Sequence, residues 1–226
     1  MIAIIKKELK SYLLTPIGYI FIGLFLLMFS LFFYVTIYQY KVTNFEYLFY
    51  NGATILTFIT PVLTMRMFAE ERKNGTEQLI LTSPRSLTSV VLGKYVAALI
   101  IILITEALTF IYYFILKYFG NPSFIVSITT LFGFFLLSAA YISFGMFASS
   151  ITENQIVACV LTIGVFILMW FLPNINEVFS TFSLINMFDK FPSGIIALDE
   201  IVTFVSFSLL FIALTIITLQ RRKSVK

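Results

Sequence analysis

The sequence predicts an all-α integral membrane protein with six transmembrane helices. The chain has 226 residues, of which 60% are hydrophobic and only 12% are charged, whereas a soluble domain carries about 25% charged residues. Its mean hydropathy is +1.00. The apolar residues form six continuous runs rather than an alternating pattern, which favours helices over the strands of a membrane barrel.

Each of the six runs is long enough to cross a bilayer, which requires about 20 mostly apolar residues. The fifth run only just reaches this length. Inside the hydrocarbon core every backbone polar group needs a partner within the protein, so each run is expected to be helical. The six predicted spans cover approximately residues 17–38, 52–69, 89–116, 124–149, 156–172 and 201–219, within a single transmembrane domain over residues 1–226.

The basic residues predict the orientation in the membrane. Of the 15 lysines and arginines, 12 fall at the N-terminus, around the second and third spans, or at the C-terminus. The other three are Lys41, Lys117 and Lys190. The positive-inside rule therefore predicts a multi-pass protein of the cell inner (cytoplasmic) membrane, with both termini and the stretch between spans two and three in the cytoplasm.

The residues before the first span predict a helix at the membrane surface. Apolar Ile2, Ile5, Leu9 and Leu13 recur at helical spacing, with Lys6, Lys7 and Lys10 among them. We expect an amphipathic helix that lies on the lipid until Pro16 ends it. The alternative is a solvated positive flank without regular structure.

The connection between the fifth and sixth spans also predicts structure. Residues 173–200 are too many for a tight turn and too apolar for a solvated loop, with side chains such as Phe179, Phe182 and Phe188. A pair of short helices that re-enter the outer leaflet would bury these side chains against protein.

A charged segment, "MRMFAEERKNGTEQLILTSPRS", separates the second and third spans. Asn74 and Glu77 fit a capping-box variant that predicts a short helix from Gly75 to about Leu81, ended by Ser83-Pro84. About seven residues do not form a stable helix alone in water, so this helix needs a partner. The partner could be the membrane surface, the rest of the subunit, or a soluble protein that receives Leu79, Ile80 and Leu81. The alternative is an ordinary charged loop.

The composition excludes several function classes. The chain has no histidine, which argues against the zinc and Ser-His membrane proteases. Gly93-Lys94 is followed by Tyr95 instead of Ser or Thr, so no P-loop is present and any ATP must be bound by another polypeptide. The net charge of +4 follows the membrane topology and does not indicate a nucleic-acid partner. We expect no catalytic, metal-binding or cofactor-binding residue in this chain.

Three features inside the spans bear on function or packing. Glu106 is the one acidic residue deep in a span, where a carboxylate is costly. It either lines a translocation path or dimer interface, or acts as a neutral acid that joins helices through partners such as Thr109. Lys94 is expected to extend to the lipid headgroups. Small residues in span four, including Gly145 and Ser149, predict close helix packing within one subunit or between two subunits.

The segment "MRMFAEERKNGTEQLILTSPRSLTSVVLGKY" resembles the region between the second and third spans of type-2 ABC transporter permeases. The resemblance is strongest to the branch of gliding-motility and copper-enzyme-maturation exporter permeases, and it extends to "KKELKSYLLTPIGY" and "ASSITENQIVA". The matching motifs are Glu70-Glu71, Gly75-Thr76-Glu77-Gln78-Leu79, Ser83-Pro84 and Gly93-Lys94-Tyr95.

This resemblance implies that residues 72–84 form a coupling helix that docks into a cleft on a separate ATP-binding subunit. It further implies an interfacial gate helix at 2–15, a dimer with a second or related permease, and re-entrant outer helices. The residues implied at or near the ATPase contact are Glu71, Arg72, Gly75, Thr76, Glu77 and Leu79.

The leading functional prediction is the membrane subunit of an ATP-driven exporter, which forms the translocation path as a dimer. A passive channel component or a membrane assembly scaffold without an ATPase is the alternative. The exporter needs a stiff cytoplasmic helix that transmits force, whereas the alternatives do not need one.

Overall fold

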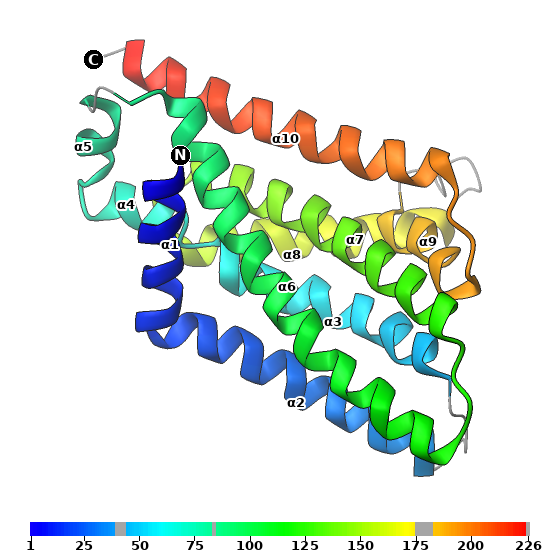
Figure 1. Ribbon diagram of the computed structural model, residues 1–226. Helices are drawn as coiled ribbons and strands as arrows, with labels where there is room; N and C mark the ends of the chain where they lie inside the picture. Colours follow the sequence, from blue (N-terminus) through cyan, green and yellow to red (C-terminus); the bar gives the residue numbers. More distant parts are fainter. Residues whose placement is uncertain (39–43, 83–84, 175–182, 225–226) are drawn as a thin grey trace.

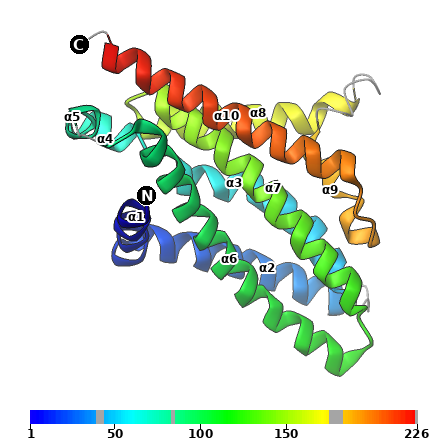
Figure 2. The same cartoon turned by 45° about the horizontal axis from the view of Figure 1, so that its top comes forward.

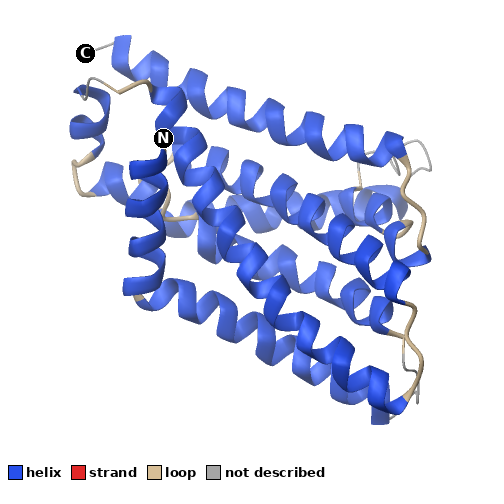
Figure 3. Ribbon diagram, in the orientation of Figure 1, coloured by secondary structure: helices blue, strands red, loops and turns tan. Residues whose placement is uncertain are grey.

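The computed structural model describes residues 1–38, 44–82, 85–174 and 183–224, and the regular secondary structure of this part is entirely helical, with loops and turns between the helices (Figure 3). The helices are α1 (Ile2–Leu14), α2 (Pro16–Tyr38), α3 (Phe45–Thr64), α4 (Ala69–Lys73), α5 (Glu77–Thr82), α6 (Leu87–Phe119), α7 (Phe124–Ile151), α8 (Gln155–Phe171), α9 (Leu184–Phe188) and α10 (Leu198–Ser224). Two short 3-10 helices, Leu172–Asn174 and Phe191–Ser193, complete the set of described elements.

Five helical stretches have the length and the apolar composition needed to cross a membrane. They are Pro16–Tyr38, Phe45–Lys73, Leu87–Phe119, Phe124–Ile151 and Leu198–Ser224. The fifth predicted span corresponds to α8, which is apolar but only 17 residues long. At 1.5 Å per residue α8 extends about 25 Å, which is less than the roughly 30 Å hydrocarbon core. The structure therefore confirms the all-α membrane class with five candidate spans.

Helix α7 is central in the bundle and packs against α3, α6, α8 and α10 (Figures 1 and 2). The most apolar stretch of α3 is 72% buried and that of α7 is 61% buried, against 22% for α2 and for α10. Rings of Phe25 and Phe29 from α2, Phe49 from α3 and Phe134 from α7 pack together at the centre. The exposed apolar faces of α2 and α10 suit contact with lipid.

The contact between α3 and α7 depends on small side chains. A Cβ added at Gly145 of α7 would lie 2.8 Å from the Cβ of Thr64 at the end of α3. Four residues further along α7, the Ser149 hydroxyl donates to the carbonyl of Met65 at 2.9 Å. Gly145 and Ser149 thus serve packing within one subunit, which decides between the two alternatives that the sequence left open.

Gly145→Ala is expected to destabilise the folded protein by about 1–3 kcal/mol, because the added methyl group meets the branch point of Thr64 and cannot be avoided by rotating a flexible side chain. Gly164→Ala on α8 is the matched control, since a Cβ there meets nothing within 4 Å. The control should be neutral or slightly stabilising. Unfolding titrations with SDS in mixed micelles measure both values, and equal effects of the two substitutions would contradict the packing role.

Both termini lie at one end of the bundle, together with α1, α4 and α5 (Figure 1). Helix α1 runs across the long helices rather than along them and packs on α6 (Figures 1 and 2). Its bounds, Ile2–Leu14, agree with the helix predicted over residues 2–15. We call this the charged end, because it also carries the ion pairs described below.

The opposite end of the bundle holds α9 and the 3-10 helix Phe191–Ser193 (Figure 1). Leu184, Ile185, Phe188 and Phe191 are buried there, and the Phe188 ring packs against Phe134 of α7. Short helices in the 173–200 connection were predicted. Phe179 and Phe182, on which part of that prediction rested, lie outside the described residues.

Candidate functional site

The charged segment between α3 and α6 forms two short helices rather than one. Helix α4 ends at Lys73 with Asn74 as its C-cap, and Gly75 follows with a φ of 72°, in the left-handed region that favours glycine. Helix α5 begins only at Glu77. A short helix was predicted from Gly75 to about Leu81, and α5 confirms it with a start two residues later. The Asn74–Glu77 capping box is wrong, because Asn74 ends α4 and the Gly75 turn separates the two helices. The predicted stop at Ser83-Pro84 lies outside the described residues.

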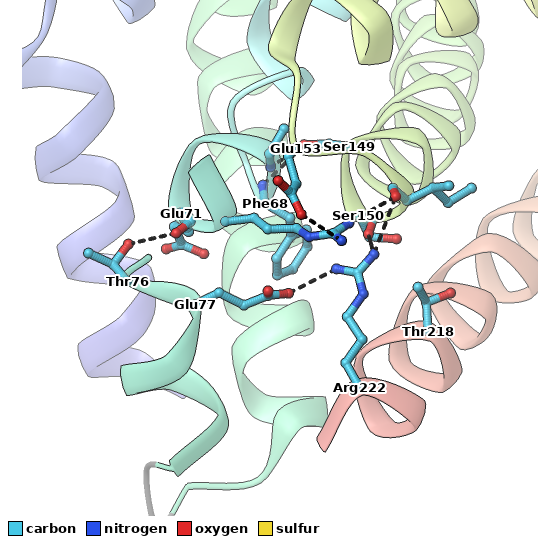
Figure 4. A network of polar contacts seen from close by, with 12 residues as sticks. Phe68, Glu71, Thr76, Glu77, Ser149, Ser150, Glu153, Thr218 and Arg222 are labelled. Atoms are coloured by element: carbon cyan, nitrogen blue, oxygen red, sulfur yellow. Dashed lines mark hydrogen bonds and ion pairs between the residues drawn. The ribbon is translucent and has the colours of Figure 1, made fainter. Parts of the chain in front are cut away.

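Helix α4 is capped by a side chain from another helix. Its N-cap residue, Phe68, offers no capping side chain of its own. The Ser149 hydroxyl of α7 instead accepts from the backbone N–H groups of Phe68 and Ala69, both at 3.1 Å (Figure 4). This contact satisfies two of the unpaired donors at a helix start and attaches α4 to α7.

Lys94 of α6 joins three helices at the charged end. Its ammonium lies 2.8 Å from the Glu71 carboxylate of α4 and 3.1 Å from the Glu8 carboxylate of α1. The same nitrogen lies 5.4 Å from the centre of the Phe68 ring. Lys94 is only 3% exposed, so the prediction that it extends to the lipid headgroups is wrong. Two carboxylates hold it inside the protein.

Two arginines converge on the C-terminal end of α7. Arg72 of α4 donates to the carbonyl of Ile151 at 3.1 Å and pairs with Glu153 at 2.8 Å. Arg222 of α10 donates to the carbonyls of Ser150 at 2.5 Å and Ile151 at 3.3 Å (Figure 4). The last carbonyls of a helix lack intrahelical partners and carry partial negative charge, so both guanidinium groups are well placed.

Arg222 also holds α5. Its second guanidinium nitrogen lies 2.9 Å from the Glu77 carboxylate, and both side chains are largely buried (Figure 4). The other α5 residues with described side chains, Gln78, Leu79 and Thr82, are exposed, and Leu79 is 72% exposed. Helix α5 therefore presents an exposed surface while one charged side chain fixes it to the bundle.

The six residues predicted for the ATPase contact divide into two groups. The side chains of Glu71, Arg72 and Glu77 point into the ion-pair network of the charged end. Gly75, Thr76 and Leu79 are exposed, and Thr76 donates to the carbonyl of Glu71 at 3.1 Å across the turn (Figure 4). The structure thus brings the six residues close together but gives them different surroundings.

Five residues of this network were not predicted as part of it: Glu8, Lys94, Ser149, Glu153 and Arg222. Lys94 was noticed but assigned to lipid, and Arg222 was counted only as one of the C-terminal basic residues. For Lys94 a signal was available. It is a lysine inside an apolar run, and acidic residues occur in the N-terminal segment and in the segment before the third span. Ser149 was predicted only to pack closely. For its role as the cap of α4, and for Arg222, the sequence held no specific signal, because the partners are distant along the chain.

A cleft of about 450 Å³ lies between α1 and the α4–α5 segment. Its lining includes Lys7, Glu8, Tyr12, Arg66 and Glu70, and the Arg66 guanidinium binds the Glu70 carboxylate through two contacts of 2.5 Å. Burial raises the pKa of Tyr12 above its usual range, and the Glu8 and Glu71 charges raise it further. Charges of both signs line the cleft. No group of three or more acidic or sulfur ligands able to hold a metal occurs among the described residues.

Glu106 lies on the face of α6 that packs inside the subunit, 7% exposed. Thr109, the partner expected for its carboxyl group, donates instead to the Glu106 backbone carbonyl at 2.7 Å. One carboxyl oxygen, Oε1, has no hydrogen-bond partner among the described residues. Glu106 is far along α6 from the ion-pair network, so it forms no part of that site.

Comparison with known proteins gives one match and one negative result. A family model described as "ABC-2 family transporter protein" matches residues 2–219, which is nearly the whole chain and includes α1 and the α4–α5 segment of the charged end but not Arg222. No curated protein matches the sequence.

Proposed function

The chain belongs to the ABC-2 family of transporter proteins, and from this we propose that it is the membrane-spanning subunit of an ATP-driven exporter whose ATP-binding subunit docks on the α4–α5 segment. Membership of the family makes the protein a multi-pass membrane component of an ABC transporter. The direction of transport, the docking segment and the dimer are the proposed parts.

One observation carries the docking proposal: the α4–α5 segment is exposed at its tip and fixed at its base. Gly75, Thr76 and Leu79 are exposed, whereas Glu71 and Glu77 are paired with Lys94 and Arg222. A partner shifts a conformational equilibrium only if it binds the two conformations differently. The α4–α5 segment is linked to α1 and α6 through Lys94, to α7 through Ser149, and to α10 through Arg222. Its position therefore changes when these helices move, so a partner bound to it can distinguish two conformations of the bundle.

We propose two roles for the predicted contact residues. Gly75, Thr76 and Leu79 touch the ATP-binding subunit. Glu71, Arg72 and Glu77 hold the α4–α5 segment in place, and they affect the partner only by setting the position of this segment. This division refines the expectation that all six lie at or near the contact.

The remaining parts of the proposal concern the membrane. We propose that the charged end, with both termini, lies on the cytoplasmic side of the cell inner membrane, and the positive-inside rule supports this through the basic residues of that end. Helix α8 crosses as the fifth of six spans, α1 lies at the inner lipid surface, and α9 re-enters from the outer side. Two permease copies, or one with a related permease, form the path, and Glu106 is a neutral acid inside each subunit. The motif order favours the gliding-motility and copper-enzyme-maturation branch.

A tagged pull-down from mildly solubilised native membranes tests the proposal. The expected result is a near-stoichiometric ATP-binding cassette protein and ATP hydrolysis by the purified complex. A folded, dimeric protein without an ATPase would instead support the passive channel or the assembly scaffold.

A further inference from the structure

We propose that Arg222 is the positioning residue through which movement of α5 reaches the transmembrane bundle. Arg222 binds Glu77 of α5 and, at the same time, the Ser150 and Ile151 carbonyls at the end of α7. A displacement of α5 therefore pulls on α7 and α10 together. This inference rests on the proposed function, because it assumes that a partner moves α5.

The first argument is that, apart from Glu77, few described side chains of α5 contact the rest of the protein. Of its side chains that the structure describes, those of Glu77, Gln78, Leu79 and Thr82, only Glu77 is buried. The Thr82 hydroxyl bonds to the Gln78 carbonyl within the same helix. On its N-terminal side α5 is joined to α4 through the Gly75 turn, where a Cβ would meet nothing within 4 Å. Among the described side chains of α5, the Glu77–Arg222 pair is thus the main fixed link to the rest of the protein.

The second argument is what Arg222 leads to. Helices α7 and α10 pack side by side along the bundle (Figures 1 and 2), and the Phe211 ring of α10 contacts Phe144 and Phe147 of α7. Helix α7 in turn contacts α3, α6 and α8. A force applied at Arg222 therefore acts on α7, which contacts α3, α6, α8 and α10 and can pass the movement to all of them.

The third argument is geometric. The planar guanidinium has several donors in a fixed arrangement, so one side chain binds a carboxylate and two carbonyls at once. A lysine supplies the charge but not this arrangement. Arg72 binds the same Ile151 carbonyl from α4, but it does not reach α5 through any contact in the described part of the chain.

The test uses the complete permease with its ATP-binding partner in proteoliposomes. In Arg222→Ala, co-purification of the ATPase should stay within about twofold of wild type, because the exposed face of α5 is unchanged. The permease-dependent change in ATP hydrolysis should fall about fivefold or more. Arg222→Lys should be intermediate. Lys223→Ala, which removes an exposed charge from the same helix end, is the matched control and should behave as wild type.

A second variant separates transmission from folding. Glu77→Ala breaks the link to α5 but leaves the Arg222 contacts with α7, so it should uncouple ATP hydrolysis in a stably folded protein. The double variant should lose no more than either single variant, since both remove the same link. Normal coupling in Glu77→Ala and Arg222→Ala, with the ATPase bound, overturns the inference alone. If wild type binds no ATPase, the proposed function fails and the inference fails with it.

Discussion

Replacing Gly75-Thr76-Glu77 with the flexible sequence Gly-Ser-Gly is expected to abolish transport and its coupled ATP hydrolysis, while membrane insertion stays intact. The replacement removes the Glu77–Arg222 pair, which fixes α5. It also adds a second glycine to a turn that already has one, which loosens the connection between α4 and α5. A partner bound to a loose α5 no longer distinguishes the conformations of the bundle, so its binding energy cannot shift them.

The matched control places the same three residues at the opposite end of the bundle. Gly120-Asn121-Pro122 connects α6 to α7 there, and Gly-Ser-Gly at this position should preserve coupling. ATP hydrolysis by the reconstituted complex, with and without the permease, is the measurement. Wild-type coupling in the variant at 75–77 would show that this segment does not transmit the action of the ATPase.

Lys94→Met is expected to destabilise the protein by about 3–5 kcal/mol, which is the usual cost of removing one partner from a buried ion pair. Lys94 has a 4% exposed side chain, and the paired Glu8 and Glu71 side chains are 12% and 16% exposed. Without the ammonium these two largely buried carboxylates are left close together without the positive charge that both of them bind. The loss should detach α1 and α4 from α6 and appear as a lower SDS concentration at the unfolding midpoint.

Two further variants test the cause of this loss. Lys73→Met, at an exposed position of α4, should change stability by less than about 0.5 kcal/mol. The triple variant Glu8→Gln, Glu71→Gln, Lys94→Met removes all three charges and should recover much of the stability, because replacing a whole buried ion group is far less costly than breaking it. A triple variant as unstable as Lys94→Met would point to lost packing of the lysine stem instead of unpaired charge.

The sequence was sufficient for the features that depend on neighbours along the chain. Hydropathy located the helices, and the end of α2 and the bounds of α1 and α8 agree with the predictions within about two residues. The uneven distribution of lysine and arginine predicted that both termini and the charged segment between spans two and three lie on the same side of the membrane. In the structure both termini, α4 and α5 lie at the same end of the bundle (Figure 1). Apolar run length is a local property, and so it can be read from a single sequence.

Only the tertiary structure decided what the charged side chains do. Lys94 and Glu8 are 86 residues apart in sequence, Arg222 and Glu77 are 145 apart, and Ser149 lies 81 residues from the Phe68 amide that it caps. Local spacing suggested instead that Glu77 pairs with Asn74 and that Lys94 reaches the lipid. Both predictions were wrong. A buried charge pairs with the opposite charge that lies nearest to it once the helices have packed, and the spacing of nearby residues in the sequence does not determine that packing.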